Sequence, residues 1–430
     1  MKSTVQSLAP IPSSPAAEVD TAQRFSLDGD FLTRTVIRRD GSRVLSHMGP
    51  SVGMDTADLE AAADLAFLKG RRRPSYDAEP PSVRFADLFA GCGALSLGVL
   101  EAARAAGRSA SCVLAVDVDP HAISVYGRSL PAQQLQTADL TELIDGKLGG
   151  RRTRQENNLL RSIEGLDLLV AGPPCQGHSA LNNHSRHDDE RNDLYLRVAR
   201  FAELGTPTFI MVENVASVTR DRRRSAARAR EHLESLGYAT DEGLADLNRL
   251  GVPQLRRRHV LVASAPGAIA LEVVDVLERY AVSNPAGRTV GWAIGDLERR
   301  NGGPFHQASI PSQANRARID WLHQQDEHNL PNSRRPPCHR DDHTYKSMYG
   351  RLWWDRPAQT ITSGFGSAGQ GRYVHPTQRR TITPHEAARL QLIPDFFDFS
   401  SVRHRGRWAQ MIGNAAPFKL SYAFALEALR

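Results

Sequence analysis

Short apolar segments alternate with helical patterns through the middle of the chain. The apolar segments are residues 83–89, 112–117, 166–171, 209–212 and 260–264, and the helical patterns are residues 94–106, 121–130 and 193–203. Strands that are apolar along their whole length are typical of a parallel sheet covered by helices on both faces. The sequence therefore predicts an α/β fold with a doubly wound, mostly parallel sheet.

The N-terminal segment before this pattern is less regular. Residues 1–24 are rich in Ser, Pro and Ala, which predicts a disordered tail. The Asp40-Gly41 pair between two short runs predicts a hairpin, and residues 55–68 predict a short capped helix. Residues 71–81 are typical of a linker into the main domain. We expect a partly disordered extension with some structure of its own.

The alternation of strands and helices ends after residue 264. Residues 266–350 are rich in Pro, Asn, His and Arg without clear periodicity, which predicts a smaller, loop-rich module. Regular patterns return at a capped helix beginning at Thr383 and at a last helix over residues 418–429. The predicted parts are an extension, residues 1–80, a larger domain, residues 81–265 plus 405–430, and a smaller domain, residues 266–404.

Size and composition narrow the class of protein. The chain has 430 residues and 40% hydrophobic content, enough for one large core and a smaller one. It has no run of about 20 apolar residues and no apolar signal core, so we expect a soluble, cytoplasmic protein without a membrane span. Its four cysteines are far apart in sequence, which does not favour a disulfide framework or a cysteine-rich zinc site.

The charge suggests a polyanionic partner. The formal net charge is +6 and the isoelectric point is near 9.3. Arginines, which suit phosphate well, occur in local runs. These runs are residues 71–73, 151–154, 220–230, 256–258 and 334–335. Each run except residues 256–258 could equally be a solvated helix face or loop.

A glycine-containing turn follows the first predicted strand. Gly91 and Gly93 would let the backbone approach a ligand beside a helix N-terminus. Asp117, at the end of the next strand, could accept both ribose hydroxyls of an adenosine, and Asp139 could accept from an adenine amine. Ser96 interrupts the dinucleotide pattern Gly-x-Gly-x-x-Gly, which argues against hydride transfer. A purely structural turn is the alternative for the two glycines.

A thiol and a carboxylate follow two other apolar strands. Cys175 lies on a turn that Pro173 and Pro174 stiffen, where helix N-termini and arginines can favour the thiolate. Glu213 emerges directly from an apolar strand and is suited to donating a proton to a ring nitrogen. A buried structural cysteine is the alternative for Cys175, and a loop-capping carboxylate is the alternative for Glu213. We interpret Cys92 and Cys112 as buried structural cysteines.

An arginine element precedes the last predicted strand. Strand alternation would place Arg256 and Arg258 on the same side of it.

Taken in order, these segments resemble the DNA cytosine carbon-5 methyltransferases over about residues 83–430. The matching motifs are DLFAGCG, the VDVDP acid, GPPCQGHS, ENV, the Gln254-x-Arg256-x-Arg258 element and QMIGNAAP, supported by RPAQTITSG and RTITPHEAARLQ. The resemblance implies the class I S-adenosylmethionine-dependent methyltransferase fold and double-stranded DNA as substrate. The smaller domain would then be the target-recognition domain, which reads a short site in the major groove.

The resemblance also implies roles for individual residues. Cys175 would attack carbon 6 of a flipped-out cytosine, Glu213 would engage ring nitrogen 3 and the exocyclic amine, and Arg258 would help to hold the base. Carbon 5 would then take the methyl group, and loss of its proton would expel Cys175. The implied cofactor pocket consists of Phe89, Gly91, Gly93, Asp117, Asp139, Pro174, Leu194, Asn414 and Ala416. The implied substrate contacts are Gln176, Ser179, Asn214 and Arg256, the last near the active-site loop or phosphate backbone.

Some positions depart from the family pattern. His178 stands where Phe is usual, Ala94 replaces a common Gly, and Ala415 replaces a common Ser. A Cys-His hydrolase would need an imidazole against the thiol, and the short Cys175–His178 separation on a loop does not favour that arrangement. Cys338, His339 and His343 could bind a metal, but no second cysteine pair accompanies them.

Three functions remain open from the sequence. The first is a DNA cytosine methyltransferase of bacterial modification or phage defence, a monomer that could be partnered by a cognate nuclease. The second is an RNA cytosine-5 methyltransferase with the same fold. The third is a non-catalytic DNA-binding protein, against which the presence of Cys175, Glu213 and Asp117 argues.

Overall fold

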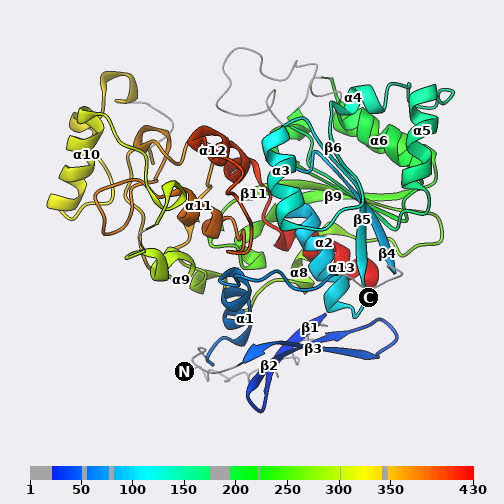
Figure 1. Ribbon diagram of the computed structural model, residues 1–430, viewed down its shortest axis with the longest axis horizontal. Helices are drawn as coiled ribbons and strands as arrows, with labels where there is room; N and C mark the ends of the chain where they lie inside the picture. Colours follow the sequence, from blue (N-terminus) through cyan, green and yellow to red (C-terminus); the bar gives the residue numbers. More distant parts are fainter. Residues whose placement is uncertain are drawn as a thin grey trace, which may run out of the picture.

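The structure is a computed structural model, and it describes residues 22–50, 56–76, 82–174, 194–220, 223–300, 302–340 and 347–430. Figure 1 shows a larger lobe around a central sheet, a smaller lobe beside it, and a small separate sheet from the N-terminal extension. We refer to the described residues between 285 and 414 as the smaller lobe.

The central sheet has seven strands in the order β6-β5-β4-β7-β8-β11-β9. Their bounds are β4 Val83–Leu88, β5 Ala110–Asp117, β6 Leu135–Thr137, β7 Leu168–Ala171, β8 Phe209–Val215, β9 Ala239–Asp246 and β11 Arg257–Ser264. Neighbouring strands from β6 to β8 are parallel, and β11 runs antiparallel to both β8 and β9. The predicted mostly parallel sheet is therefore confirmed.

Helices cover both faces of this sheet. One face packs against α2 Ala94–Ala105, α3 Pro120–Ser129, α8 Val273–Arg279 and α13 Lys419–Leu429. The other face packs against α4 Leu140–Leu143, α5 Arg154–Ile163, α6 Leu194–Gly205 and α7 Ser225–Ser235. Successive residues of β8 alternate between the two cores, with Met211 on the first side and Val212 on the second. This two-sided burial explains why the strands are apolar throughout.

The smaller lobe contains more helix than the sequence indicates. Its elements are α9 Val290–Ile294, α10 Gln313–Gln324, α11 Pro384–Leu390, α12 Arg405–Asn414 and the short strand β12 Ala358–Gln359, which pairs with β10 Gln254–Leu255. The expectation of an irregular segment over residues 266–350 was wrong for α8 and α10. Only Ile319 and Leu322 of α10 are buried, so its apolar pattern is too sparse to predict a helix.

Two helices pack against elements outside the domains in which they were expected. Helix α8, expected in the smaller domain, packs against β9 and α13 in the larger lobe. Helix α12, expected in the larger domain, packs against α11. The chain therefore crosses into the smaller lobe after α8 and returns after α12.

The extension forms a three-stranded antiparallel sheet and one helix. Its elements are β1 Gln23–Asp28, β2 Phe31–Ile37, β3 Arg43–Pro50 and α1 Leu59–Leu68. Strands β2 and β3 confirm the predicted hairpin, whereas β1 begins inside the segment expected to be a tail. In the segment expected to be a linker, Tyr76 is buried and donates a hydrogen bond to Glu101 Oε1 at 2.8 Å.

Helices α2 and α13 approach each other closely, although they come from opposite ends of the domain. Ser421 Oγ of α13 donates to the Leu95 carbonyl of α2 at 2.8 Å. A Cβ atom at Gly98 would overlap Ser421 Oγ and the Phe418 carbonyl oxygen. The absence of a side chain at Gly98 is therefore what permits this contact.

We expect Gly98→Ala to lower the free energy of unfolding by about 2 kcal/mol, because one methyl group must push two helix backbones apart. Urea denaturation would measure this loss. Gly406→Ala in α12 is the matched control, since a Cβ there meets open space. A loss at Gly98 no larger than at Gly406 would contradict the packing interpretation.

Candidate active site

The carboxyl ends of the parallel strands bring several predicted site residues to one edge of the sheet. Asp117 ends β5, the turn with Gly91 and Gly93 follows β4, and Pro173 and Pro174 follow β7. Glu213 lies near the end of β8. Ligands of open α/β sheets bind at this edge, in the crevice outside the strand ends.

The glycine turn and Asp117 are held together by backbone hydrogen bonds. Gly91 N donates to Asp117 Oδ2 at 2.8 Å, and Asp119 N donates to Asp117 Oδ1 at 2.8 Å. Phe89, Gly91 and Gly93 all have positive φ angles, of 60°, 55° and 95°. A Cβ at Gly93 would lie 2.7 Å from Leu130 Cδ1, so this glycine meets a steric as well as a conformational requirement.

The electrostatics at Asp117 result from opposing effects. Burial raises the pKa of Asp117, and the hydrogen bonds from Asp119 N and Gly91 N oppose that rise but leave the pKa above its usual value. Each carboxylate oxygen accepts one backbone hydrogen bond and retains a further lone pair. Asp117 can therefore accept hydroxyl donors without losing its backbone support.

The other predicted cofactor residues lie at helix ends and in loops. Asp139 is exposed and caps α4, accepting from Thr141 N at 2.8 Å. Leu194 begins α6 and is half-buried, as is Pro174. Asn414 is exposed at the end of α12, and buried Ala416 lies in the link to α13. The link between α12 and α13 leads into a helix that packs on α2, and Gly93 is the N-cap of α2.

Glu213 forms a close ion pair at the end of β8. Its Oε1 lies 2.6 Å from Arg258 Nε of β11, and both side chains are mostly buried. A Cβ at Gly172 would lie 3.6 Å from Glu213 Oε2, so the second oxygen faces the start of the turn that leads to Cys175. The carboxylate is thus oriented by Arg258 through one oxygen, with the other directed toward that turn.

Two further polar residues of the predicted site, Asn214 and Arg256, are buried. Asn214 Nδ2 donates to the Pro173 carbonyl at 3.2 Å, which ties β8 to the turn after β7. Arg256 donates to the Ile361 and Gly413 carbonyls at 3.0 and 3.2 Å and is buried. The chain does not continue as one strand from Gln254 to Arg258, because β10 and β11 pair with different partners. Arg256 therefore points into the protein.

Cys175, Gln176, His178 and Ser179 lie outside the described residues. The structure describes the chain to Pro174 and again from Leu194, the first residue of α6.

Sequence reasoning missed Asp87, which lies within β4 beneath the glycine turn. Ser96 Oγ donates to Asp87 Oδ2 at 2.6 Å, and Tyr126 OH donates to Ser96 Oγ at 2.7 Å. These contacts join β4 to α2 and α3, the two helices that flank the glycine turn. A carboxylate between the buried apolar residues Ala86 and Leu88 was the available signal.

Sequence reasoning also missed Val118, which immediately follows Asp117. Its side chain is 69% exposed. An apolar side chain beside a ribose-binding carboxylate can pack against a flat base. Together with the close-approach glycines and Asp117, Val118 fits the adenosine part of S-adenosylmethionine.

Comparison with known proteins identifies the family. A sequence model of the family described as C-5 cytosine-specific DNA methylase matches residues 83–430. The chain belongs to this family. It is 42% identical over 97% of both chains to the Type II methyltransferase M1.BsuMI of Bacillus subtilis (strain 168). It is 31% identical to the Type II methyltransferase M1.HphI of Haemophilus parahaemolyticus, over 81% of this chain and 87% of that protein.

A solved structure shares the fold. The Dnmt2 methyltransferase of S. pombe superimposes with a TM-score of 0.55 at 17% identity, covering 80% of this chain and 97% of that one. The predicted family, class I methyltransferase fold, enzyme class and S-adenosylmethionine cofactor are therefore confirmed. Among the described residues, no helix is long and apolar enough to cross a membrane.

The buried carboxyl of Asp87 predicts a pH-dependent stability. Burial raises its pKa from 3.8 to about 7, so the folded protein holds the proton more tightly than the unfolded chain. The protonated Asp87 carboxyl therefore contributes to the free energy of unfolding at low pH, and this stabilisation is lost as pH rises toward 7. We expect Asp87→Asn, which cannot ionise, to gain on the order of 2 kcal/mol relative to wild type between pH 5 and pH 8.

Urea unfolding of both proteins at several pH values would measure that difference. The exposed Asp40→Asn serves as the control for a general effect of removing a carboxylate. If wild type and Asp87→Asn lose stability in parallel as pH rises, Asp87 is not the titrating group.

Proposed function

We propose that this protein methylates carbon 5 of a flipped-out cytosine in a short duplex DNA site, with Cys175 as the nucleophile. The observation that carries the proposal is the Glu213–Arg258 pair at 2.6 Å, directed toward Gly172 at the start of the Cys175 turn. Thiol addition at carbon 6 requires a group that holds ring nitrogen 3 at the same time. Glu213 lies where it can do so from the adjacent parallel strand.

Each polar residue has a defined part in this proposal. Arg258 fixes Glu213 through Oε1, which leaves Oε2 for ring nitrogen 3 and the exocyclic amine. The Cys175 thiolate adds to carbon 6, which makes carbon 5 nucleophilic. Loss of the carbon-5 proton then breaks the bond between Cys175 and carbon 6 and frees the thiolate. Asn214 is a positioning residue, because it holds the Pro173 carbonyl that precedes the nucleophile.

The cofactor pocket is proposed around the glycine turn. Asp117 would take the ribose hydroxyls, Val118 and Phe89 would flank the adenine, and Asp139 would accept from its amine. The remaining lining residues would be Gly91, Gly93, Pro174, Leu194, Asn414 and Ala416. When bound, S-adenosylmethionine supplies the methyl group that carbon 5 takes.

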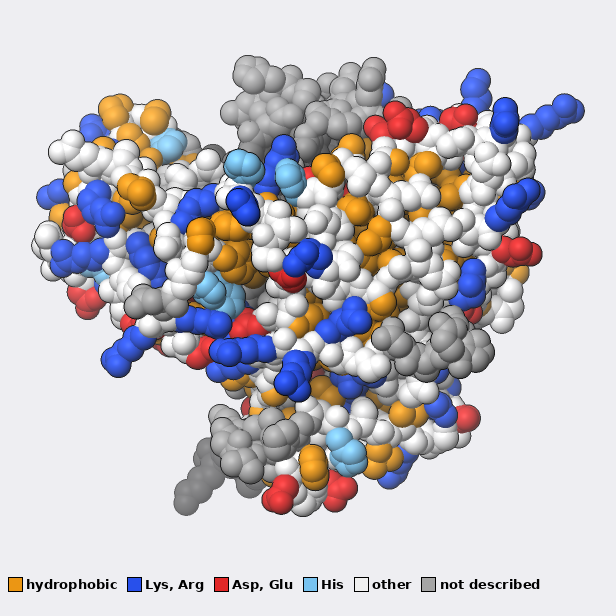
Figure 2. All heavy atoms as spheres, in the orientation of Figure 1, with side chains coloured by type: hydrophobic (Ala, Val, Ile, Leu, Met, Phe, Trp, Pro, Cys, Tyr) orange, Lys and Arg blue, Asp and Glu red, His pale blue; other side chains and the backbone are white. Residues whose placement is uncertain are grey.

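Duplex DNA as substrate requires a compensating binding surface. Extruding a base costs a few kcal/mol, which phosphate and groove contacts must offset. Figure 2 shows Lys and Arg side chains gathered over the smaller lobe. Exposed Arg334 and Arg356 lie over the rings of Trp321 and Trp353, with guanidinium-to-centroid distances of 5.1 and 4.7 Å. Stacked guanidinium groups are well placed to contact phosphates or guanine edges, which supports target recognition by this lobe.

The biological setting is proposed from the relatives. Two of them are Type II methyltransferases, which supports modification of host DNA within a restriction–modification or phage-defence system. Such a setting would place the protein in a bacterial cytoplasm, acting as a monomer beside a cognate nuclease. Gln176 and Ser179 would contact the substrate beside Cys175 and Asn214, whereas the buried contacts of Arg256 support a structural role for that residue.

Methylation mapping tests the reaction and its site. We expect expression of the wild-type chain to add 5-methylcytosine to host DNA at one short sequence, and Cys175→Ser to abolish it because serine is a far weaker nucleophile. Glu213→Gln should reduce the modification strongly, since an amide cannot supply the proton. Absence of new 5-methylcytosine from DNA, with a folded wild-type protein that binds S-adenosylmethionine, would refute the proposal.

Covalent trapping separates DNA from RNA as the substrate. In a duplex library containing 5-fluorocytosine, carbon 5 has no proton to lose, so the Cys175 adduct should persist as a complex stable to denaturing electrophoresis. Cys175→Ser should form none. A matched RNA transcript containing 5-fluorocytidine serves as the comparison, and trapping of RNA alone would favour an RNA methyltransferase.

A further inference from the structure

Helix α1 of the N-terminal extension lies between the two lobes and contacts both. The family model matches residues 83–430, so this helix precedes the matched region. In Figure 1, α1 lies beneath the junction of the lobes, with the small β1–β3 sheet below it. Its side chains show that it does more than attach that sheet.

Phe67 makes aromatic contacts in both directions. Its ring lies 5.9 Å from Phe396 of the smaller lobe in an edge-on arrangement, and 5.4 Å from Phe418 at the start of α13 in the larger lobe. The end of the same helix is fixed by Asp395 N, which donates to the Leu68 carbonyl at 3.0 Å. One side chain of α1 therefore fills the space between residues of two lobes.

A buried charge cluster repeats this bridging pattern. Asp64 Oδ1 lies 2.6 Å from Lys419 Nζ of α13, and Asp64 Oδ2 lies 3.7 Å from Arg288 Nη2 of the smaller lobe. Asp58 accepts a hydrogen bond from Arg288 Nη1 at 2.9 Å. Arg288 is fully buried, so its charge is compensated mainly by the carboxylates of α1. Burial raises the pKa of nearby Glu60 to about 7, which moderates the negative charge of the cluster.

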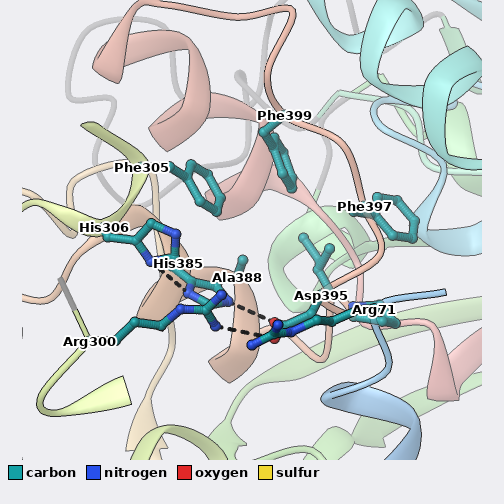
Figure 3. Close-up of a pocket in the computed structure, with 11 residues that line it drawn as sticks. Arg71, Arg300, Phe305, His306, His385, Ala388, Asp395, Phe397 and Phe399 are labelled. Carbon is teal, nitrogen blue, oxygen red and sulfur yellow. Dashed lines mark hydrogen bonds and ion pairs between the residues drawn. The ribbon is translucent and has the colours of Figure 1, made fainter. Parts of the chain in front are cut away.

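The chain after α1 continues along the smaller lobe. Lys69 Nζ lies 3.4 Å from Asp296 Oδ1. Figure 3 shows Arg71 reaching into a pocket of about 290 Å³ that it shares with Arg300 and Asp395. The contacts of the extension with the smaller lobe therefore run from Asp58 to Arg71.

Among the described residues, the side-chain hydrogen bonds and ion pairs between the β1–β3 sheet and the two lobes all reach the larger lobe. Arg39 pairs with Glu427 of α13 at 2.8 Å, Tyr422 OH donates to Gln23 Oε1 at 2.7 Å, and Arg38 donates to the Ala106 carbonyl at 3.0 Å. The sheet anchors the extension to the larger lobe, and α1 reaches from that anchor to the smaller lobe.

We propose that α1 is a strut that fixes the angle between the catalytic and target-recognition lobes, with Asp58 and Phe67 as positioning residues for DNA. The proposal rests on the proposed function, in which the duplex binds both lobes at once. A lobe angle held in advance lowers the cost of ordering the protein around DNA. The strut acts on DNA binding, since none of its residues belongs to the cofactor or thiol site.

Two substitutions weaken the strut in different ways. Asp58 also caps α1, and asparagine caps helices equally well, so Asp58→Asn weakens the pair with Arg288 while the helix start is kept. Phe67→Ala removes the ring between the lobes. For each we expect KM for duplex DNA to rise roughly fivefold, with single-turnover methylation at saturating DNA and affinity for S-adenosylmethionine within about twofold of wild type.

Arg39→Ala is the matched control, because Arg39 joins the extension to the larger lobe alone. It should lower the melting temperature without changing KM for DNA. Unchanged KM in both folded strut variants, or an equal rise in Arg39→Ala, would overturn the proposal.

Small-angle X-ray scattering of the free proteins provides a readout that does not depend on catalysis. The strut predicts a larger radius of gyration for Phe67→Ala than for wild type and Arg39→Ala, and equal radii would overturn it. A wild-type protein with no activity on DNA would instead count against the proposed function, and the scattering result would still decide on the strut.

Discussion

The close packing of α13 against α2 is the contact on which most of this structure depends. Only a glycine at position 98 allows Ser421 and the Phe418 carbonyl to approach α2 so closely. The contact joins the last helix of the chain to the first helix of the catalytic domain, after the chain has passed through the whole smaller lobe. It thereby brings the link with Asn414 and Ala416 to the helix that begins at the glycine turn. The same helix presents Lys419, Tyr422 and Glu427 to the N-terminal extension.

Much of the larger lobe could be predicted from the sequence because its strands are buried on both faces. Such strands are continuous apolar runs, and the residues at their ends then fall at one edge of the sheet. Strand β9 was missed because it lies at the edge of the sheet and most of its residues are partly or fully exposed. Helix α10 was missed for the same reason, since two buried residues are too few to produce a helical pattern. Sequence patterns reveal burial, and elements with little of it escape detection.

For the candidate site, the sequence motifs predicted which residues are present, and the structure shows how those residues interact. Motif order was enough to indicate Asp117 and Glu213, because each ends or follows an apolar strand. It could not show that Arg258 binds Glu213 through one oxygen, since that pairing depends on the register between β8 and β11. Strand alternation is not a sufficient guide for Arg256, because β10 ends at Leu255 and β11 begins at Arg257. The buried Arg256 instead ties the carbonyls of Ile361 and Gly413 to the edge of the larger lobe.

Buried arginine side chains and their hydrogen-bond and ion-pair partners join the two lobes. Two buried arginines, Arg256 and Arg288, lie at the junction, and neither is placed to contact DNA. Arg256 donates to carbonyl oxygens, whereas Arg288 pairs with carboxylates of α1 and its N-cap, which precede the family's matched region. A buried guanidinium that loses its carboxylates leaves an uncompensated charge, so α1 stabilises the smaller lobe in this position. The extension is therefore an integral part of the catalytic unit, because it supplies the charges that the junction of the lobes requires.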